Sequence, residues 1–558
     1  MPLRRAASNV LSRMAFALEI LEGPTPRART YGQASRTIFQ LEGDLAELRR
    51  SGALDRVRGL GPSTLAVIDD VIAGREPEEL VSLEGQIPAG LFEIRKIKGL
   101  GPAKIRALSL PPEQGGLGIS TLGELEHACK ENRLVTLPGF GDKTQANVLA
   151  GVQAERRHDG MHLRDAALEM AQQLVMRAAA GRRHALVGDL AMGSELVASV
   201  AVLVEGEGAA REEMAFGEGV SGVVFHAPSD RFGVVLVRET SDAGHFAALK
   251  ARATELGLAL DDDRLTRNAE IVATPTDASL YEALDLYFVP TEARRADAIF
   301  ARKGSAPKEL VARGDLRGAL HNHTLASDGT ATLAEMRAAA IAWGLSYLGI
   351  SEHSQSADYA RGLTRERIAA QLGELDAMNA QGASCTLLSG IESDILADGA
   401  LDYPDDVLRS LEVVIASSHR RFSLDREKST ARMVRAAGSP CTDVLGHPTG
   451  RLLLGRAPLD FDVDAVLSAC VKSGCAVELN GSAHRLDFGA RELGMAKERG
   501  ILVSIAADAH ATGEIAEHLD HGIAVARRAG LTPDDVLNAK PLPALRAWLK
   551  ARRARASV

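Results

Sequence analysis

The chain has 558 residues, of which 46% are hydrophobic and 25% are charged, and its formal net charge at pH 7 is −9. One hydrophobic core does not grow to this size, so we expect two or more domains of ordinary globular composition. No apolar run reaches membrane-spanning length, and the net charge alone does not indicate a nucleic-acid-binding protein. Residues 1–150, however, contain 19 basic and 18 acidic side chains, so the acidic excess follows residue 150.

The first twenty residues, MPLRRAASNVLSRMAFALEI, include arginines but neither a sustained apolar core nor a small-residue cleavage site. This pattern predicts an amphipathic helix rather than a signal peptide. The five cysteines are an odd number without paired spacing, and none lies in a zinc-type CxxC motif. We therefore expect a cytoplasmic protein that does not associate with membranes.

A glycine-rich pattern occurs three times, in Val57–Ile68 (VRGLGPSTLAVI), Ile97–Leu108 (IKGLGPAKIRAL) and Thr136–Leu149 (TLPGFGDKTQANVL). In each copy the glycines allow a tight turn, and the helix that follows presents free backbone N–H groups to a phosphate oxygen. A single copy is equally well explained as a corner without a ligand, but three copies predict DNA-backbone contacts without sequence readout. The candidate contacts are Gly59, Gly61, Gly99, Gly101, Lys104, Gly139 and Gly141.

The segment NVLSRMAFALEILEGPTPRARTYGQASRTI, followed by these hairpins, resembles the N-terminal DNA-end-binding domain and fingers of family X DNA polymerases. In some members of that family a lysine of this domain attacks the sugar of an abasic site. Residues 1–95 contain no lysine, so this lyase activity is not expected here.

Residues 184–204 resemble the palm of the same family but lack its carboxylates. The resemblance places Ser199 and Ala201 where the family has an Asp-x-Asp pair, and Val223 near its third aspartate. Two-metal nucleotidyl transfer needs several carboxylates, so we expect a folded sheet without polymerase activity. The alternative is a shifted site formed by Asp189, Glu195 and Glu205.

After residue 316, seven short apolar runs alternate with helical segments, which predicts a parallel α/β architecture with a site at the carboxyl ends of the strands. Six of the seven runs end in residues that can bind a metal. These residues are His321, His323, Asp328, His353, Glu392, His419, His447, Asp508 and His510. Each histidine alone is better explained as an ordinary core or surface residue. Burying the whole set would be costly unless its members share cations, so the set predicts a metal centre.

Nine mixed nitrogen and oxygen ligands are too many for one tetrahedral ion and suit three divalent ions. Glu392 is the expected bridge, because a carboxylate can bind two ions, and His321, His323, Glu392 and Asp508 are expected to hold one ion. A bound cation lowers the pKa of water towards about 7 and so provides a nucleophile for attack on phosphorus. Three arginines follow ligand strands and are candidates for gripping substrate phosphates, or else for surface ion pairs: Arg421, Arg451 and Arg485.

The motifs HNHTLASDG, ISEHS, GIESDILADGALDYPDDVL, IASSHRRF, GHPTGRLLLGR and DAH resemble the polymerase-and-histidinol-phosphatase (PHP) domain, in the version fused to bacterial and archaeal family X polymerases. This resemblance implies a distorted seven-stranded, TIM-like barrel with three divalent metals, most active with manganese, although zinc or iron is an alternative. It also implies 3′-to-5′ degradation of DNA and activity at abasic sites or 3′-phosphates, with Glu392, Asp508 and His323 as catalytic residues. The expected partner is gapped or 3′-ended duplex DNA, recognised with weak sequence preference.

The resulting prediction is a multidomain protein. It comprises a helical domain with three helix-hairpin-helix motifs (1–150), an α+β degenerate nucleotidyltransferase palm with thumb (151–300), a linker (301–315) and an α/β PHP barrel (316–558). Two alternatives to a DNA-processing phosphoesterase remain open at this point. One is a small-molecule phosphomonoesterase resembling histidinol phosphatase, and the other is a non-catalytic DNA-binding protein.

Overall fold

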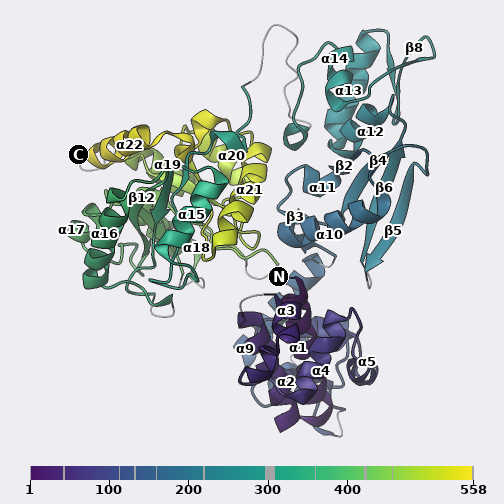
Figure 1. Ribbon diagram of the computed structural model, residues 1–558, viewed down its shortest axis with the longest axis vertical. Coiled ribbons are helices and arrows are strands. Elements are labelled where there is room, and N and C mark those ends of the chain that lie inside the picture. Colours follow the sequence, from purple (N-terminus) through teal and green to yellow (C-terminus); the bar gives the residue numbers. More distant parts are fainter. Residues whose placement is uncertain are drawn as a thin grey trace. The chain divides into compact units, whose positions relative to one another are not determined.

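The computed structural model describes the chain except for residues 1, 42–43, 112–113, 131–132, 159, 218–219, 296–307, 358–359, 420–423, 455–456 and 556–558. It consists of two compact units, Met1–Asp159 and Gly160–Val558 (Figure 1). Among the described residues, no helix is long and apolar enough to cross a membrane.

The first unit is helical. Its helices are α1 (Pro2–Glu22), α2 (Pro26–Gln40), α3 (Leu45–Arg50), α4 (Pro62–Ile72), α5 (Glu78–Glu84), α6 (Gly90–Ile94), α7 (Pro102–Ser109), α8 (Leu122–Lys130) and α9 (Asp142–His158). The core forms around α1, because Leu11, Met14 and Leu18 recur at helical spacing and are fully buried. Helix α9 runs through residue 150, the expected domain boundary, and ends at His158.

The three glycine repeats fold as hairpins between a short helix and a longer one. The first glycine of each repeat adopts a left-handed backbone, with φ of 96° at Gly59, 90° at Gly99 and 82° at Gly139. The second glycine immediately precedes α4, α7 or α9, and proline begins the first two of these helices. The predicted helix-hairpin-helix geometry is therefore present in all three repeats.

The second unit begins with a four-stranded sheet in the order β2-β4-β6-β5. The elements of this region are β1 (His162–Leu163), α10 (Arg164–Ala178), β2 (His184–Val187), α11 (Gly188–Ala191), β3 (Leu196–Val197), β4 (Ala201–Glu205), β5 (Arg211–Gly217) and β6 (Val220–Ala227). Strands β4 and β6 are parallel, with Ala201 paired to Val223. A smaller α+β segment follows, with α12 (Phe232–Glu239), α13 (Ala243–Glu255), β7 (Ala259–Leu260), β8 (Leu265–Arg267), β9 (Glu270–Val272) and α14 (Asp277–Ala283).

Residues 316–558 form the predicted barrel, which in the described part of the chain has seven parallel strands in sequential order. The strands are β10 (Gly318–Ala319), β11 (Tyr347–Ile350), β12 (Thr386–Asp394), β13 (Val413–Ser417), β14 (Val444–Leu445), β15 (Ala476–Asn480) and β16 (Val503–Ala506). Two backbone hydrogen bonds connect the segments that directly follow β10 and β16, from His323 N to Ala509 O and from Asp508 N to His321 O, each 2.9 Å long. The barrel therefore closes at the residues predicted to bind metal.

Helices surround these strands (Figure 1). They are α15 (Leu333–Trp343), α16 (Arg365–Ala380), α17 (Asp405–Arg409), α18 (Arg426–Ala437), α19 (Val463–Ser473), α20 (Ala490–Glu498), α21 (Thr512–Arg528) and α22 (Leu542–Arg555). Leu545 and Leu549 of α22 pack with apolar strand residues such as Val413 and Ala476 in one buried cluster. Part of the strand surface is thus packed in an apolar core, while the predicted metal ligands lie at the carboxyl ends of the strands.

Candidate metal centre

The carboxyl ends of the barrel strands bring all nine predicted ligands into one cluster. Glu392, near the carboxyl end of β12, lies in the middle of this cluster and is close to five imidazoles. The nitrogen-to-oxygen distances are 2.8 Å to His447, 2.8 Å to His353, 3.2 Å to His419, 3.3 Å to His321 and 3.7 Å to His323. A carboxylate surrounded in this way is placed to bridge neighbouring cations.

Two further carboxylates complete the cluster. Asp508 Oδ1 lies 3.2 Å from His323 Nε2 and 3.5 Å from His321 Nε2. Asp328 lies 3.3 Å from His353 and 3.4 Å from His510. The potential ligand atoms form three groups in which all atoms lie within 4.8 Å of one another: His321–His323–Asp508, His323–Asp328–His353–His510 and His353–Glu392–His419.

The donor atoms fit divalent cations. His321, His323, Glu392 and His447 are at most 1% exposed. Among the described residues, Nδ1 of His323 and Nδ1 of His447 are buried without a hydrogen-bond partner. Orphaned polar atoms of this kind are costly unless something polar or charged joins them. Imidazole and carboxylate donors together suit transition-metal ions such as Mn²⁺, Fe²⁺ and Zn²⁺.

In this cluster, neighbouring opposite charges shift the pKa values in the direction opposite to the effect of burial. Burial disfavours the charged form of Glu392, but the surrounding imidazoles, His419 foremost, hold its pKa well below the usual range. Burial also opposes a charge on His353, yet the nearby carboxylates, Glu392 foremost, raise its pKa to about 10. Burial lowers the pKa of His323 to about 3. Glu392 therefore stays ionised, and without a metal its charge is balanced by protonated imidazoles such as His353, whose protons a bound cation would replace.

An outer layer of polar residues orients the ligands. His321 Nδ1 lies 2.8 Å from Glu478 Oε2, and His419 Nδ1 lies 2.6 Å from Asp394 Oδ1. Asn480 Nδ2 donates to Asp508 Oδ2 over 2.9 Å. Such partners select the ring nitrogen that faces a metal. Asp394 was not predicted, although its position two residues after Glu392 places both side chains on one face of β12.

Glu352 orders the loop that holds Asp328. This fully buried carboxylate accepts hydrogen bonds from Thr324 Oγ1 at 2.5 Å, from Gln371 Nε2 at 3.2 Å and from Ser327 Oγ. Burial raises its pKa, and the hydroxyl donors partly offset that effect. Glu352 thereby fixes the turn in which Asp328 occurs. This residue was not predicted to belong to the site, although the ISEHS motif contains it.

Two of the predicted ligands have left-handed backbones, with φ of 22° at His447 and 49° at Asp508. Non-glycine residues rarely adopt this conformation, and it concentrates where surrounding structure imposes it at functional sites. His447 N donates to Glu478 Oε1 over 3.1 Å, which helps to hold the turn after β14.

The predicted phosphate-binding arginines differ in their surroundings. Arg485 Nε lies 3.7 Å from Asp508 Oδ2, and Nη1 of the same side chain is buried without a hydrogen-bond partner among the described residues. Arg451 instead forms an ion pair with Glu195, at 2.7 Å, and donates to the carbonyl oxygen of Arg485. Arg421 lies outside the described residues.

The hairpins of the first unit expose their backbone. An added Cβ would meet nothing within 4 Å at Gly61, Gly99, Gly101, Gly139 or Gly141, whereas at Gly59 it would meet Thr37 and Gln33 side chains at 3.4 and 3.5 Å. In the first hairpin, Thr64 Oγ1 accepts the Gly61 N–H at 2.8 Å. The equivalent residue of the second hairpin is Lys104, which cannot accept, and whose Nζ lies 5.4 Å from the centre of the Phe140 ring in the third hairpin.

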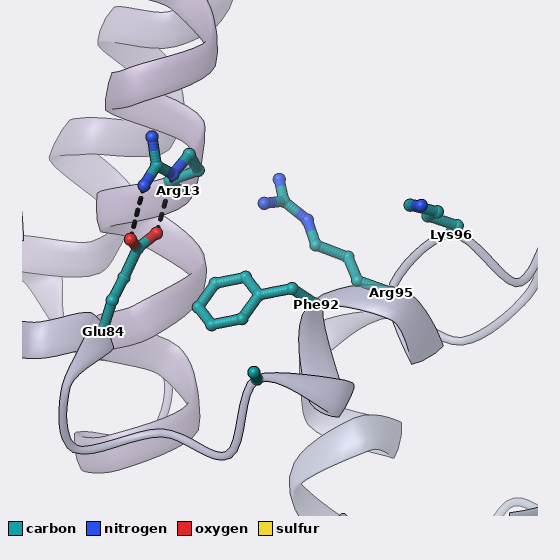
Figure 2. Close-up of a pocket in the computed structure, with 6 residues that line it drawn as sticks. Arg13, Glu84, Phe92, Arg95 and Lys96 are labelled. Carbon is teal, nitrogen blue, oxygen red and sulfur yellow. Dashed lines mark hydrogen bonds and ion pairs between the residues drawn. The ribbon is translucent and has the colours of Figure 1, made fainter. Parts of the chain in front are cut away.

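A surface cavity of about 600 Å³ lies beside the second hairpin (Figure 2). Its lining comprises Arg13, Glu84, Ala89, Phe92, Arg95 and Lys96. Glu84 pairs with Arg13 at 2.5 Å, so that cation is neutralised. The Arg95 guanidinium lies 4.8 Å from the Phe16 ring centre, and no described carboxylate forms an ion pair with it. The lining thus has an excess of positive charge next to an aromatic ring.

The palm-like sheet lacks metal ligands at the three expected positions. Ala201 and Val223 face each other across β4 and β6, and Ser199 is exposed just before β4. The three carboxylates of the alternative, shifted site each interact with a different partner. Glu205 pairs with Arg183, Asp189 accepts hydrogen bonds from Ser194 and Ala198, and Glu195 pairs with Arg451. Within the described residues, groups of three or more potential ligands occur only in the barrel. The structure therefore does not assemble the shifted site considered from the sequence.

Comparison with known proteins matches both the whole chain and its C-terminal region. The chain is 31% identical to the DNA polymerase/3′-5′ exonuclease PolX of Bacillus subtilis, over 97% of this chain and 98% of that protein. It is 28% identical to a probable phosphatase of Thermoanaerobacter over 39% of this chain and 88% of the relative. A probable phosphatase of Caldanaerobacter subterraneus is 26% identical over 42% of this chain and 91% of its own length. No protein-family model matches the chain. The full-length similarity shows that this chain belongs to the PolX family of DNA polymerase/3′-5′ exonucleases.

Proposed function

We propose that this protein is a metal-dependent phosphoesterase that processes DNA ends, acting chiefly as a 3′-to-5′ exonuclease. The main support is the cluster of six histidines and three carboxylates around Glu392 at the carboxyl end of the barrel. The full-length PolX relative is named as a 3′-5′ exonuclease, which agrees with this chemistry. Activity at abasic sites or on 3′-phosphates would use the same centre.

Three divalent ions, most suitably Mn²⁺, would be held by the nine ligands, with Zn²⁺ or Fe²⁺ as alternatives. When bound, such ions supply Lewis acidity and an activated water for attack on phosphorus. The protein's own residues then have definable tasks. Glu392, Asp508 and His323 hold the middle of the site, and Glu478 and Asp394 orient His321 and His419. The Arg485 side chain, which is 19% exposed and lies beside Asp508, would offer its guanidinium to a phosphate oxygen.

Gapped or 3′-ended duplex DNA, bound with weak sequence preference, is the proposed substrate. The open glycine loops of the hairpins suit contacts to phosphate, which position DNA without reading its sequence. The cavity beside Phe92, with its adjacent cations, is a further surface to which a strand could bind (Figure 2). The five cysteines are all buried and free, in keeping with a reducing compartment such as the cytoplasm.

Polymerase activity is proposed to be lost. Nucleotidyl transfer through two metals needs carboxylates at neighbouring positions, and serine, alanine and valine occupy the positions where the family has them. The sheet remains folded because its own core, including Val202, Val204 and Val224, is intact.

A phosphatase acting on small phosphomonoesters is the second candidate. The similarity of the C-terminal region to probable phosphatases favours it. The three hairpins argue for DNA, since a metabolite enzyme has no use for them.

The test uses purified full-length protein with Mn²⁺ and a 5′-labelled gapped duplex, with and without dNTPs. His323→Ala serves as the inactive control. We expect a ladder of shortened products that the control does not form, and no extension. Extension by dNTPs would contradict the proposed loss of polymerase activity. Hydrolysis of a small phosphomonoester without any shortening of DNA would instead support the second candidate.

A further inference from the structure

One side chain of the palm-like region, Glu195, reaches the rim of the barrel. Its Oε1 accepts a hydrogen bond from Ala490 N at 3.0 Å, and its Oε2 lies 2.7 Å from Nη2 of Arg451. Ala490 begins α20, and the residue before it, Gly489, has no side chain to cap the helix. A carboxylate is the favoured partner for such a helix end, so Glu195 acts as a cap supplied from almost 300 residues away, the sequence separation being 295.

Glycines permit this close approach on both sides. A Cβ added to Gly489 would lie 2.4 Å from Glu195 Oε1. In the Glu195 loop, a Cβ added to Gly193 would lie 2.7 Å from the carbonyl oxygen of Ala524 in α21. Gly193 also has a φ of 73°, which other residues rarely adopt. The loop thus meets the barrel at two helices, and each contact needs a small residue.

Arg451 links this contact to the metal centre. Besides its ion pair with Glu195, its Nε donates to the carbonyl oxygen of Arg485 over 2.9 Å, and its Nη2 donates to that of Leu486. The Arg485 side chain in turn lies 3.7 Å from Asp508, with Nη1 buried and free of hydrogen bonds to described residues. A chain of contacts therefore runs from Glu195 through Arg451 to a guanidinium beside the predicted ligand Asp508.

We propose that Glu195 is a positioning residue, through which the palm-like region holds Arg485 in place to bind a substrate phosphate. The inference rests on the proposed phosphoesterase function for its consequence, but the physical link can be tested without turnover. Removing the carboxylate leaves Arg451 without one charged partner and α20 without its cap. The 485–490 segment then opens more readily, and Arg485 is no longer fixed beside Asp508. Phosphate binding weakens, whereas the metal ligands keep their own partners.

The first measurement is hydrogen–deuterium exchange on the full-length protein. In Glu195→Ala, peptides covering residues 485–492 should exchange about tenfold faster, as expected from the loss of a hydrogen bond to a charged group. Glu195→Gln keeps an acceptor for Ala490 N but not the ion pair, so its effect should be smaller. Gly489→Ala, which displaces the carboxylate from the barrel side, should resemble Glu195→Ala. The exposed Glu207 provides a matched control, Glu207→Ala, which should not differ from the wild type.

The second measurement, of phosphate binding and steady-state kinetics, distinguishes a role of Glu195 in positioning Arg485 from a general role in stabilising the fold. We expect Glu195→Ala to weaken inorganic phosphate binding to the Mn²⁺-loaded protein about five- to tenfold by calorimetry. It should raise KM for bis(p-nitrophenyl) phosphate by a similar factor, with kcat and bound manganese within twofold of the wild type. Unchanged exchange would overturn the link, and unchanged phosphate affinity would overturn the positioning role. If the wild type bound phosphate but hydrolysed neither DNA nor the diester, the proposed function would fail while the phosphate affinities still decided the role of Glu195.

Discussion

Asp394 Oδ1 accepts a hydrogen bond from His419 Nδ1 over 2.6 Å, and this bond directs the opposite nitrogen, Nε2, to a point 3.2 Å from Glu392. Ser356 Oγ donates to the other Asp394 oxygen over 2.7 Å, so the carboxylate is itself held in place. His419 thus has one orientation in which it can act as a ligand.

We predict that Asp394→Asn weakens metal binding and activity about 10- to 100-fold, the usual effect of removing such a partner. The asparagine amide oxygen can still accept a hydrogen bond from His419 Nδ1, but it lacks the negative charge of the carboxylate. Metal titration followed by phosphodiester hydrolysis would measure the effect. Asp398→Asn is the control, because Asp398 follows the same strand but is exposed and pairs with Arg435. Equal metal affinities for the two variants would contradict the assigned role of Asp394.

Divalent metal should stabilise the barrel. A ligand at 100 times its dissociation constant adds about 2.7 kcal/mol to the free energy of unfolding, provided that it binds only the folded state. Adding Mn²⁺ to chelator-treated protein should therefore raise Tm progressively with concentration in differential scanning fluorimetry. Glu392→Gln should largely abolish this rise, because it removes the charge at the middle of the cluster. A rise of equal size in that variant would show that the cations stabilise some other site.

His521 should make stability depend on pH. This residue of α21 is 3% exposed, and burial, followed by repulsion from Arg164, lowers its pKa to about 4. The unfolded chain takes up this proton near the ordinary value of about 6.5, whereas the folded chain does not until about pH 4. Stability is therefore fully present above pH 6.5 and is lost as the pH falls towards 4, by up to about 3 kcal/mol.

Urea unfolding at several pH values would measure this loss. His521→Gln cannot titrate, so its stability should change less between pH 6.5 and 4 than that of the wild type, whatever the absolute values. An identical pH dependence in the two proteins would rule out His521 as the titrating group.

Lys104 should contribute to DNA binding through charge alone. It lies in the second hairpin above the Phe140 ring of the third, close to two open glycine loops. Lys104→Glu should lower affinity for gapped DNA about three- to tenfold, and should reduce the slope of log K against log salt by about one. Fluorescence anisotropy across a salt series would show both effects. Lys472→Glu makes the same charge change on an exposed residue of α19, and a slope equally reduced there would argue against a specific contact.

Much of the candidate metal centre was predictable because it follows from short-range patterns. Apolar runs that alternate with helices specify parallel strands, and the ends of parallel strands meet at one edge of a sheet. A ligand such as Glu392 or His447 at the end of its run is therefore placed near the others without knowledge of side-chain packing. The glycine hairpins were predictable for a related reason, since a left-handed turn can be recognised from Gly59, Gly99 and Gly139 themselves.

The outer partners were not predictable to the same degree. Asp394, Asn480 and Glu352 occur in buried strand ends like many other polar residues, and their roles depend on which atoms meet across neighbouring strands. These contacts are settled by packing at a scale of tenths of an ångström, for which the sequence pattern has no counterpart.

The sequence alone therefore determined the family resemblance, the barrel, the set of candidate ligands and the absence of carboxylates at Ser199 and Ala201, because each follows from residue types at local spacing. Only the tertiary structure decided that Glu195 joins no group of potential metal ligands among the described residues, and instead caps α20 and pairs with Arg451. A single carboxylate forms no repeating sequence pattern from which its role could be predicted. Its role is set by the charges and free N–H groups that folding brings next to it.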